Sequence, residues 1–234
     1  IKAHPARICA CHVVTYELHS KLMFLSRLSQ RIGQNKRFPT RGNFSSVKLP
    51  DDGDNIEAPN ASDASLIPPF SIIAMARNHD YLIGLNGGIP WKVPEDRAYF
   101  KAMTADGVLV MGKRTWLENK KHLPHAARTI VLSSDGAFRE KIGKLDKVDT
   151  AVDLKDALQL AKATSDEEAR GGVWVVGGEE IYRRSLNDFT EHARQIHLTV
   201  LDDGTMSPTA EETKGAKFPR REEWEGSWKL KKQW

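Results

Sequence analysis

The acidic residues Glu95 and Asp96 are the side chains best placed to do chemistry in this chain. They follow Pro94, and proline and carboxylates both favour a first helical turn, where carboxylates face the positive end of the helix dipole. The preceding residues 83–93 form a glycine-rich stretch that leads from a predicted strand into this helix. Two interpretations are open: an ordinary helix cap, which is common, or an acid at the edge of an apolar pocket that faces a polar heterocycle.

Two further junctions between a predicted strand and a predicted helix could bind phosphate. They cover residues 110–116, which include Lys113 and Arg114, and residues 175–182, which include a glycine pair. Glycine lets a ligand approach the backbone closely, and free N–H groups at a helix start attract anions. Either junction alone is a weak signal, because a glycine pair after a strand is more often a tight turn. Together they predict a ligand with more than one phosphate, lying across the carboxyl ends of the strands.

Short apolar runs predict the strands that position these junctions. Helix candidates at 94–104, 113–119, 153–163 and 179–185 alternate with strand candidates at 70–76, 108–111, 129–132, 173–176 and 196–201. Near-continuous apolar strands separated by helices predict an α/β fold whose sheet is covered on both faces. Ser133 and Ser134 follow the third strand, where they either add hydroxyls to the phosphate ligand or form an ordinary turn.

Charge divides the chain into a basic leader and a mildly acidic domain. Residues 1–48 hold nine Lys and Arg against one acid, a net of +8, whereas the remainder holds 26 basic against 30 acidic residues, a net of −4. A nucleic-acid-binding domain would concentrate its basic charge on the folded part, so we expect no nucleic-acid partner. Residues 49–69 are rich in Pro, Asp, Ser and Asn and are predicted to be a linker. No apolar run approaches the roughly 20 residues of a membrane span.

The leader has the composition of an organellar transit peptide. It is rich in arginine and serine, it is almost free of acids, and its apolar residues fall at helical spacing: Leu18, Leu22, Leu25, Leu28 and Ile32. We expect a mitochondrial protein, with a plastid as the alternative, or the cytoplasm if the leader is instead a surface helix that binds a partner. Met23 is the predicted initiator, which would make residues 1–22 upstream sequence.

The cysteine content favours a reducing compartment and no metal site. Cys9 and Cys11 are the only cysteines, and they lie in the leader with one residue between them. With His12 they supply too few ligands for a metal, and they are too close for an easy disulfide. The predicted domain contains no cysteine and therefore no disulfide, which suits a reducing compartment.

Six motifs in order make residues 70–201 similar to dihydrofolate reductases. They read I-G-x-N-G-G-I-P-W-x-x-P-E-D-x-x-x-F-K, V-M-G-K-R-T-W, L-P, T-I-V-L-S-S, V-V-G-G-E-E-I-Y and I-x-L-T. The resemblance implies a three-layer dihydrofolate-reductase-like fold with a central mixed, mostly parallel sheet. It also implies the NADPH-dependent reduction of 7,8-dihydrofolate to 5,6,7,8-tetrahydrofolate, a step of one-carbon metabolism and tetrahydrofolate biosynthesis.

The resemblance places the pterin of the substrate around Asp96. There Asp96 would bind the 2-amino group and N3 of the pterin and raise the basicity of N5, and Thr199 would support the carboxylate. Trp91 would hold an ordered water, and Ile89 belongs to a mobile loop that closes over the nicotinamide. The implied catalytic residues are Asp96, Trp91 and Thr199, and the implied substrate-binding residues are Ala76, Asp96, Phe100, Arg128 and Thr199.

The resemblance also assigns a cofactor site. Lys113, Arg114 and Thr115 would hold the pyrophosphate and the 2′-phosphate, which favours NADPH over NADH. The nicotinamide would lie near Tyr182, and the adenosine near Ser133 and Ser134. The full implied set is Ala76, Ile83, Gly84, Gly112, Lys113, Arg114, Thr115, Ser133, Ser134, Gly177, Gly178, Glu179, Ile181 and Tyr182.

Several positions depart from the family pattern. Arg97 and Asn119 stand where apolar residues usually contact the substrate, and Arg128 lies one position from the usual clamp for the glutamate α-carboxylate. An apparent insertion covers 202–216 and reads as an exposed loop. The family still needs a turn and one more strand after about residue 234, so we predict a domain over 70–234 that is truncated at its C-terminus and exposes a sheet edge.

These departures leave alternatives to a dihydrofolate reductase. One is a non-catalytic dihydrofolate-reductase-like subunit of a larger organellar assembly. Another is a related NADPH-dependent pteridine or pyrimidine reductase with a smaller substrate. Fusion to a thymidylate synthase would explain a truncated domain.

Overall fold

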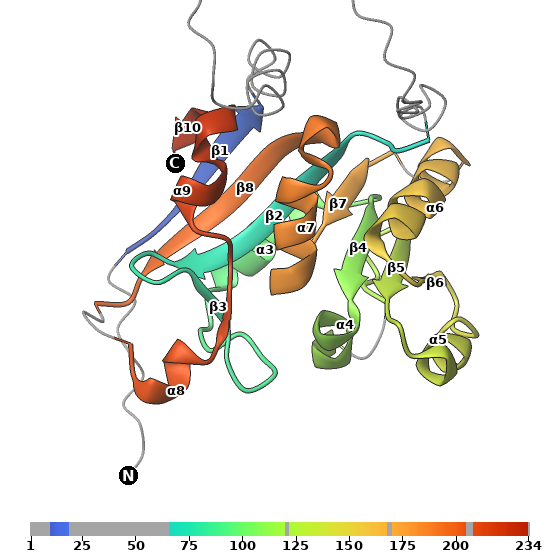
Figure 1. Ribbon diagram of the computed structural model, residues 1–234, viewed down its shortest axis with the longest axis horizontal. Helices are drawn as coiled ribbons and strands as arrows, with labels where there is room; N and C mark the ends of the chain where they lie inside the picture. The colour runs from blue at the N-terminus through green and yellow to red at the C-terminus, as the bar shows by residue number, and fades with distance from the viewer. Residues whose placement is uncertain (1–9, 19–65, 120–121, 168–169, 205–207, 234) are drawn as a thin grey trace, which may run out of the picture.

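One sheet of eight strands organises the chain (Figure 1). The computed structural model describes residues 10–18, 66–119, 122–167, 170–204 and 208–233. The strand order is β10-β1-β8-β2-β7-β4-β5-β6, and β1 alone runs antiparallel to its neighbours in this sheet. The predicted mixed, mostly parallel sheet is thus confirmed. The strands are β1 (Ala10–Leu18), β2 (Phe70–Arg77), β4 (Val108–Gly112), β5 (Arg128–Leu132), β6 (Val148–Ala151), β7 (Val173–Val175), β8 (Ala193–Asp202) and β10 (Trp228–Gln233).

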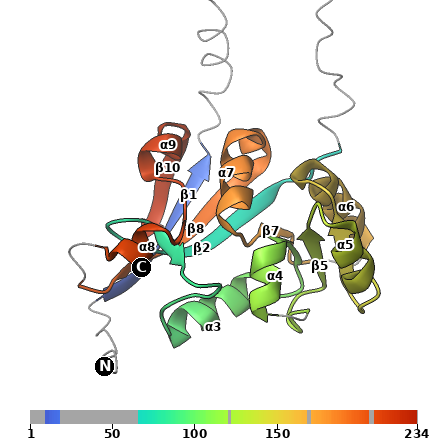
Figure 2. The same cartoon turned by 60° about the horizontal axis from the view of Figure 1, so that its bottom comes forward.

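Helices cover both faces of the sheet, which gives three layers. Alternate residues of β4 divide between two buried clusters: Val108 and Val110 belong to one, and Leu109 and Met111 to the other. The first cluster includes α6 (Leu154–Glu167), α7 (Glu179–Asn187) and α9 (Arg221–Trp224), and the second includes α3 (Pro94–Met103), α4 (Lys113–Asn119) and α5 (Gly136–Ile142). Figure 2 shows α3 and α4 on one side of the sheet and α7 and α9 on the other. We call these sides the α3 face and the α7 face.

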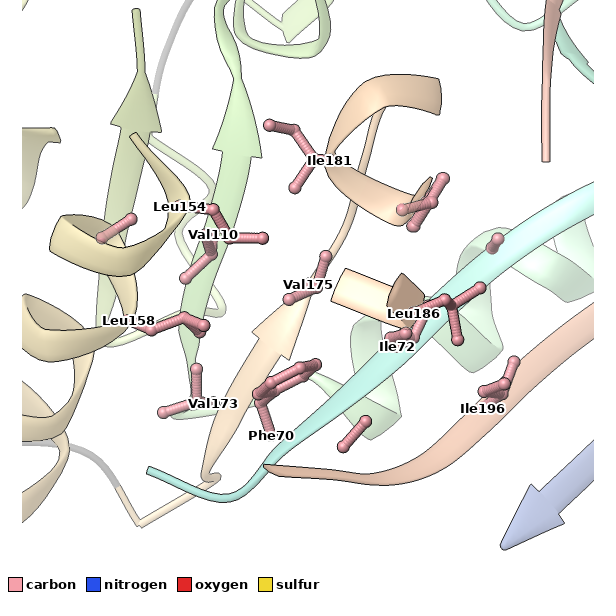
Figure 3. Close-up of a cluster of buried hydrophobic side chains, with 14 of the residues drawn as sticks. Phe70, Ile72, Val110, Leu154, Leu158, Val173, Val175, Ile181, Leu186 and Ile196 are labelled. Carbon is pink, nitrogen blue, oxygen red and sulfur yellow. The ribbon is translucent and has the colours of Figure 1, made fainter. Parts of the chain in front are cut away.

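The α7 face holds the larger core (Figure 3). Helix α6 packs there through Leu154, Ala157, Leu158 and Ala161, whose spacing puts them on one side of the helix. These side chains are essentially inaccessible to solvent. Burying each leucine stabilises the fold by about 1.5–3 kcal/mol relative to leaving it exposed. The same spacing is visible in the sequence, and α6 extends the helix predicted over 153–163.

Strand β1 lies inside the sheet, between β8 and β10, although its residues belong to the predicted leader. Val14 and Tyr16 are only 5% and 3% exposed, and they contribute to the core on the α7 face. The assignment of residues 1–48 to a separate leader is therefore corrected for residues 10–18. The physical reason is that Val13, Val14 and Thr15 are β-branched and favour a strand. Residues 19–65, with Met23 and most of the predicted transit peptide, lie outside the described residues.

The predicted loss of an internal strand is also corrected. Residues 228–233 form β10 at the edge of the sheet, and β1 occupies the position between β10 and β8 that the sequence analysis left without a strand. The core also reaches into the predicted linker, because Ile67 is buried within it. The remaining short elements are β3 (Leu82–Gly84), which pairs with β9 (Ala216–Lys217), then α8 (Ala210–Thr213), and two 3-10 turns, η1 (Thr190–His192) and η2 (Glu225–Ser227).

A buried arginine, Arg77 at the end of β2, connects the sheet to the predicted insertion. Its side chain is 1% exposed, and its Nε and Nη2 each donate to one oxygen of Asp80 at 2.9 Å. Its Nη1 donates to Glu212 Oε1 at 2.7 Å and to Asp203 Oδ2 at 3.3 Å. Lys217 Nζ adds a bond to Asp80 at 2.9 Å. The described part of segment 202–217 is therefore folded against the sheet and is not a simple exposed loop.

We expect Arg77→Met to lower the free energy of unfolding by about 3–5 kcal/mol, because it removes the cation that three carboxylates share, and Lys217 then pairs only with Asp80. Urea denaturation at neutral pH measures this loss. Arg194→Met is the matched control, since Arg194 lies exposed on β8 of the same sheet and should change stability by less than about 0.5 kcal/mol. Equal stabilities of the two variants would contradict the role assigned to Arg77.

Candidate active site

Asp96 lies in the first turn of α3 and points its carboxylate toward the sheet. The Thr199 hydroxyl of β8 forms a hydrogen bond with that carboxylate, and Thr199 itself is 2% exposed. Helix α3 has no side-chain hydrogen bond at its N-cap, residue Val93. The contact with Thr199 favours the second interpretation of this acid, a carboxylate at a site, over the ordinary helix cap.

The surroundings of Asp96 disfavour its charge. Burial raises the pKa of the Asp96 carboxyl, and the hydrogen bond from Thr199 only partly opposes that effect. Half-buried carboxyl groups with a raised pKa occur often at sites that bind or protonate a ligand. A ligand that offers paired N–H donors would satisfy this carboxylate better than the present surroundings do.

Helix α3 leaves an apolar surface partly uncovered beside Asp96. None of its residues is fully buried, and Tyr99, Phe100 and Met103 only partly pack on the core of the α3 face. The ring of Phe100 stands edge-on to His125 with centroids 5.6 Å apart. Arg97 is exposed. Asp96 and Phe100 thus lie on the same helix, one turn apart, and the substrate-binding role of Phe100 stays a prediction.

The two glycine junctions meet at the carboxyl ends of neighbouring strands. Gly112, which ends β4, donates its N–H to the carbonyl of Gly177 after β7 at 2.8 Å. Gly177 has a φ of +109°, and a Cβ there would lie 2.9 Å from the Tyr182 hydroxyl, so only glycine fits. A Cβ on Gly178 would approach Thr115 Oγ1 at 3.4 Å. The junctions form one glycine cradle, as the sequence predicts, and this fits a phosphate-bearing ligand.

Lys113 adds a positive charge at the edge of this cradle. Its Nζ lies 2.8 Å from Asp135 Oδ2, and Asp135 caps α5 by accepting the N–H of Phe138. Ser133 Oγ accepts the N–H of Asp135 at 3.1 Å, so the loop after β5 comes close to the start of α4. Arg114 and Ser134 are exposed beside them. The predicted residues of the adenosine and phosphate end thus gather in one region.

Helix α7 offers backbone groups more than side chains. The Tyr182 hydroxyl donates to the carbonyl of Ile73 at 2.8 Å, and complete burial raises its pKa far above the usual range. Glu179 accepts the N–H of Lys217 at 3.1 Å and pairs with Arg183 at 2.9 Å. Ile181 packs beside Gly112. These side chains hold α7 in place, so a ligand here would bind mainly to the N–H groups at its start.

Some predicted residues lie elsewhere. The Trp91 indole N–H donates to Asp203 Oδ2 at 3.2 Å, and its ring faces Arg77 with 5.8 Å between the ring centroid and the guanidinium carbon. Ile83 and Gly84 lie on β3, where Gly84 pairs with Ala216. The indole N–H of Trp91 is thus occupied by Asp203, and the predicted role of Trp91 in holding a water molecule stays a prediction.

The side chain of Ala76 belongs to the core on the α7 face, so only its backbone could contact a ligand beside Asp96. Its neighbour Met75 is the partner of Thr199 in the register between β2 and β8, and it is half-buried. Strand alternation therefore places Met75 on the α3 face with Thr199. Met75 lies outside the sequence motifs, and the period of two along β2 is the signal that places it beside Thr199.

The structure does not bring Arg128 to the substrate side. Arg128 alternates along β5 with Thr129 and Val131, and Val131 lies on the α3 face, so the arginine belongs to the α7 face with Ile130. There its guanidinium pairs with both carboxylate oxygens of Asp149. We therefore correct the predicted substrate set by leaving Arg128 out of it.

No helix in the described ranges is long and apolar enough to cross a membrane. Within the same ranges, no group of three or more His, Cys, Asp and Glu is placed to hold a metal ion.

A three-layer α/β fold whose glycine-rich junctions meet at the carboxyl ends of β4 and β7, with a half-buried acid on α3, is an arrangement typical of enzymes that bind a nucleotide. The family model of dihydrofolate reductase matches residues 70–229. The chain therefore belongs to the dihydrofolate reductase family, whose members use a nicotinamide cofactor.

Curated relatives agree with this assignment. A dihydrofolate reductase of Mycobacterium leprae is 33% identical over 138 residues, which cover 56% of this chain and 76% of the relative. A dihydrofolate reductase of Mycobacterium tuberculosis is 31% identical over 141 residues, covering 56% of this chain and 76% of the relative. A bifunctional dihydrofolate reductase-thymidylate synthase of Glycine max is 30% identical over 146 residues, covering 58% of this chain and 27% of the relative.

The raised pKa of Asp96 predicts a pH-dependent effect on stability. The folded protein holds this proton more tightly than the unfolded chain does, so stability falls as pH rises from the unfolded-state pKa of about 3.9 through the folded-state pKa. We expect Asp96→Asn, which cannot ionise, to melt at a higher temperature than the natural chain at about pH 7 and to lose this advantage at about pH 3.

Thermal unfolding followed by circular dichroism at both pH values measures the effect. Asp146→Asn is the control, because Asp146 is exposed in a turn and should show no such difference between the two pH values. A lower melting temperature for Asp96→Asn at neutral pH would contradict the prediction.

Proposed function

We propose that this chain reduces 7,8-dihydrofolate to 5,6,7,8-tetrahydrofolate with NADPH. The observation that carries the proposal is the hydrogen-bonded pair Asp96 and Thr199, a carboxylate and hydroxyl that come together from α3 and β8. Their strand β8 lies two places from β7 in the sheet, and β7 leads into the glycine cradle. A pterin held at the carboxylate and a dinucleotide held at the cradle would meet over the carboxyl ends of β2 and β7.

The side chains of this chain bind the pterin and orient it. The carboxylate of Asp96 accepts two N–H bonds from the 2-amino group and N3 of the pterin, and the Thr199 hydroxyl donates to that carboxylate and fixes its orientation. The negative charge of the Asp96 carboxylate beside N3 raises the basicity of the ring system, so N5 gains a proton more readily. Phe100 supplies an apolar face for the ring. The bound nicotinamide supplies the hydride.

Charge at the cradle favours NADPH over NADH. Lys113 and Arg114 lie side by side at the start of α4, where cations can pair with the 2′-phosphate that NADPH alone carries. Gly112, Gly177 and Gly178 pack closely against Ile181, Tyr182 and Thr115, which brings the backbones of the two junctions together at the strand ends. Backbone N–H groups exposed there are suited to the phosphates of a dinucleotide.

Asp96→Asn is expected to lower kcat/KM for dihydrofolate by about a hundredfold or more, the range for losing a group that steers protonation. The assay follows NADPH oxidation with dihydrofolate as the oxidant. Glu95→Gln is the matched control, since Glu95 is the exposed neighbour in the same helical turn. If the natural chain binds NADPH but reduces no dihydrofolate, the non-catalytic subunit is favoured.

The double variant Lys113→Ala, Arg114→Ala is expected to weaken NADPH about 10- to 100-fold, the usual cost of losing hydrogen bonds to a charged group, while NADH changes little. Titration of each cofactor by fluorescence measures both affinities. Lys141→Ala, on the exposed side of α5, serves as the control for loss of positive charge. An equal loss of affinity for NADPH and NADH would show that Lys113 and Arg114 do not recognise the 2′-phosphate.

One observation favours a second candidate, the reduction of a smaller pteridine. The bond of Arg128 to Asp149 removes the predicted clamp for the glutamate tail of dihydrofolate. Comparing kcat/KM for dihydrofolate with that for a dihydropteridine that lacks the tail separates the two. Equal values would favour the smaller substrate.

Localisation and fusion remain proposals. We propose a mitochondrial enzyme on the composition of residues 1–48, with the plastid as the alternative, or the cytoplasm if this segment is not a transit peptide. The structure sets a condition on where such a presequence could be cleaved. Cleavage after Leu18 would remove β1 from the sheet. The bifunctional relatives of Glycine max and Arabidopsis thaliana, of which the chain covers 27% and 26%, make a thymidylate synthase fusion a further proposal.

A further inference from the structure

The family match begins at residue 70, so β1 lies outside it while occupying an internal place in the sheet. β1 pairs with β8 along eight consecutive positions, from Ala10 opposite Asp202 to Glu17 opposite Gln195. It also pairs with β10, up to Leu18 opposite Trp228. The strand that carries Thr199 is thus bordered by a segment that the family motifs do not include.

We propose that β1 is a working part of the folate side of this enzyme, with Thr15 as a positioning residue that holds α3, and through it Asp96, against the sheet. The inference rests on the proposed function for the identity of the ligand.

Strand alternation puts Thr15 on the correct face. Val14 and Tyr16 lie in the core of the α7 face, so Val13 and Thr15 point to the α3 face. Val13 lies directly opposite Thr199 in the antiparallel register. Cys11 lies on the same face of β1 by this alternation. Burial raises the pKa of its thiol most, and the nearby charge of Asp96 raises it further. One face of β1 therefore runs alongside the carboxylate site.

A chain of hydrogen bonds connects Thr15 to α3 and to the sheet. The hydroxyl of Tyr99 on α3 lies 2.7 Å from His197 Nδ1. The buried Thr15 stands directly opposite His197 in the register of β1 and β8, and it is placed to donate to the same Tyr99 hydroxyl, a bond that partly offsets the rise in the Tyr99 pKa caused by burial. His197 Nε2 lies 3.0 Å from Gln195 Oε1, and Gln195 Nε2 donates to Glu17 Oε1 at 3.0 Å. We call these five residues the Tyr99 network.

The charged end of this network determines the direction of every bond. Lys231 pairs with Glu17, so Glu17 is an ionised acceptor and the amide nitrogen of Gln195 must face it. The amide oxygen of Gln195 then accepts from His197 Nε2, which leaves Nδ1 as the acceptor for the Tyr99 hydroxyl. Burial lowers the pKa of His197 to about 4, which agrees with a neutral ring.

Because the Tyr99 hydroxyl donates its single proton to His197, its oxygen is free to accept from Thr15. Thr15 is therefore the donor that completes the network. Tyr99 follows Asp96 by three residues and lies on the same side of α3. Since no residue of α3 is fully buried, these bonds are a major constraint on the position of the helix.

Thr15→Val in the full chain tests this, because valine keeps the shape and the strand preference but removes the hydroxyl. We expect dihydrofolate to bind about tenfold more weakly, the effect of losing one buried hydrogen bond, with NADPH affinity unchanged. Thr15→Ser should restore affinity to within about twofold of the natural chain. Tyr16→Phe, on the opposite face of the same strand, is the matched control and should bind normally.

A double-variant cycle separates positioning from general loss of structure. If Thr15 acts through Asp96, then Thr15→Val should cost little further affinity in a chain that already carries Asp96→Asn. Additive losses would overturn the proposal, as would normal dihydrofolate binding by Thr15→Val or a failure of serine to rescue.

Amide hydrogen exchange tests the same inference without any ligand. Thr15→Val should raise exchange along α3 and leave α4 unchanged. If the natural chain neither binds nor reduces dihydrofolate, only the proposed function is overturned. Amide hydrogen exchange along α3 would still decide the role of Thr15. Unchanged exchange along α3 would overturn the inference about β1.

Discussion

The buried guanidinium of Arg77 is the constraint on which the loops around the active site depend. A cation that is removed from water must be matched by nearby acids, and here the acids come from three separate segments. Asp80 follows β2, Asp203 follows β8, and Glu212 lies on α8. Burial alone would raise the pKa of Asp80, but the bonds from Arg77 and Lys217 outweigh it and hold the pKa well below its usual range.

The same contacts connect the glycine-rich loop before α3 to segment 202–217. Trp91 donates to Asp203, and Asn86 Nδ2 donates to Glu211 Oε1 at 2.6 Å. A loop that follows a strand thus gains fixed partners on a segment more than 100 residues later. The sequence alone shows this segment only as a polar insertion, because an acid in a loop does not reveal which cation it will meet.

Local patterns predicted the strands and helices of residues 70–201 because those elements bury apolar residues at regular spacing. They also predicted that the glycine junctions at 110–116 and 175–182 meet at the carboxyl ends of strands, whereas only the resemblance to dihydrofolate reductases implied that Thr199 supports Asp96. The same reasoning failed for Arg128, since its strand position decides which face it occupies. It also missed Tyr99, His197 and Thr15, whose hydrogen bonds join residues far apart in the sequence.

Strand β1 has a consequence for the order in which the domain assembles. Both neighbours of β1 are made late: β8 begins at Ala193, and β10 begins at Trp228. During synthesis the first strand has no partner until nearly the whole domain has left the ribosome, so the sheet closes only at the end. Contacts of this length slow folding and leave strand edges open in the meantime. A chaperone that shields residues 10–18 during translation would therefore meet this protein at its most vulnerable stage.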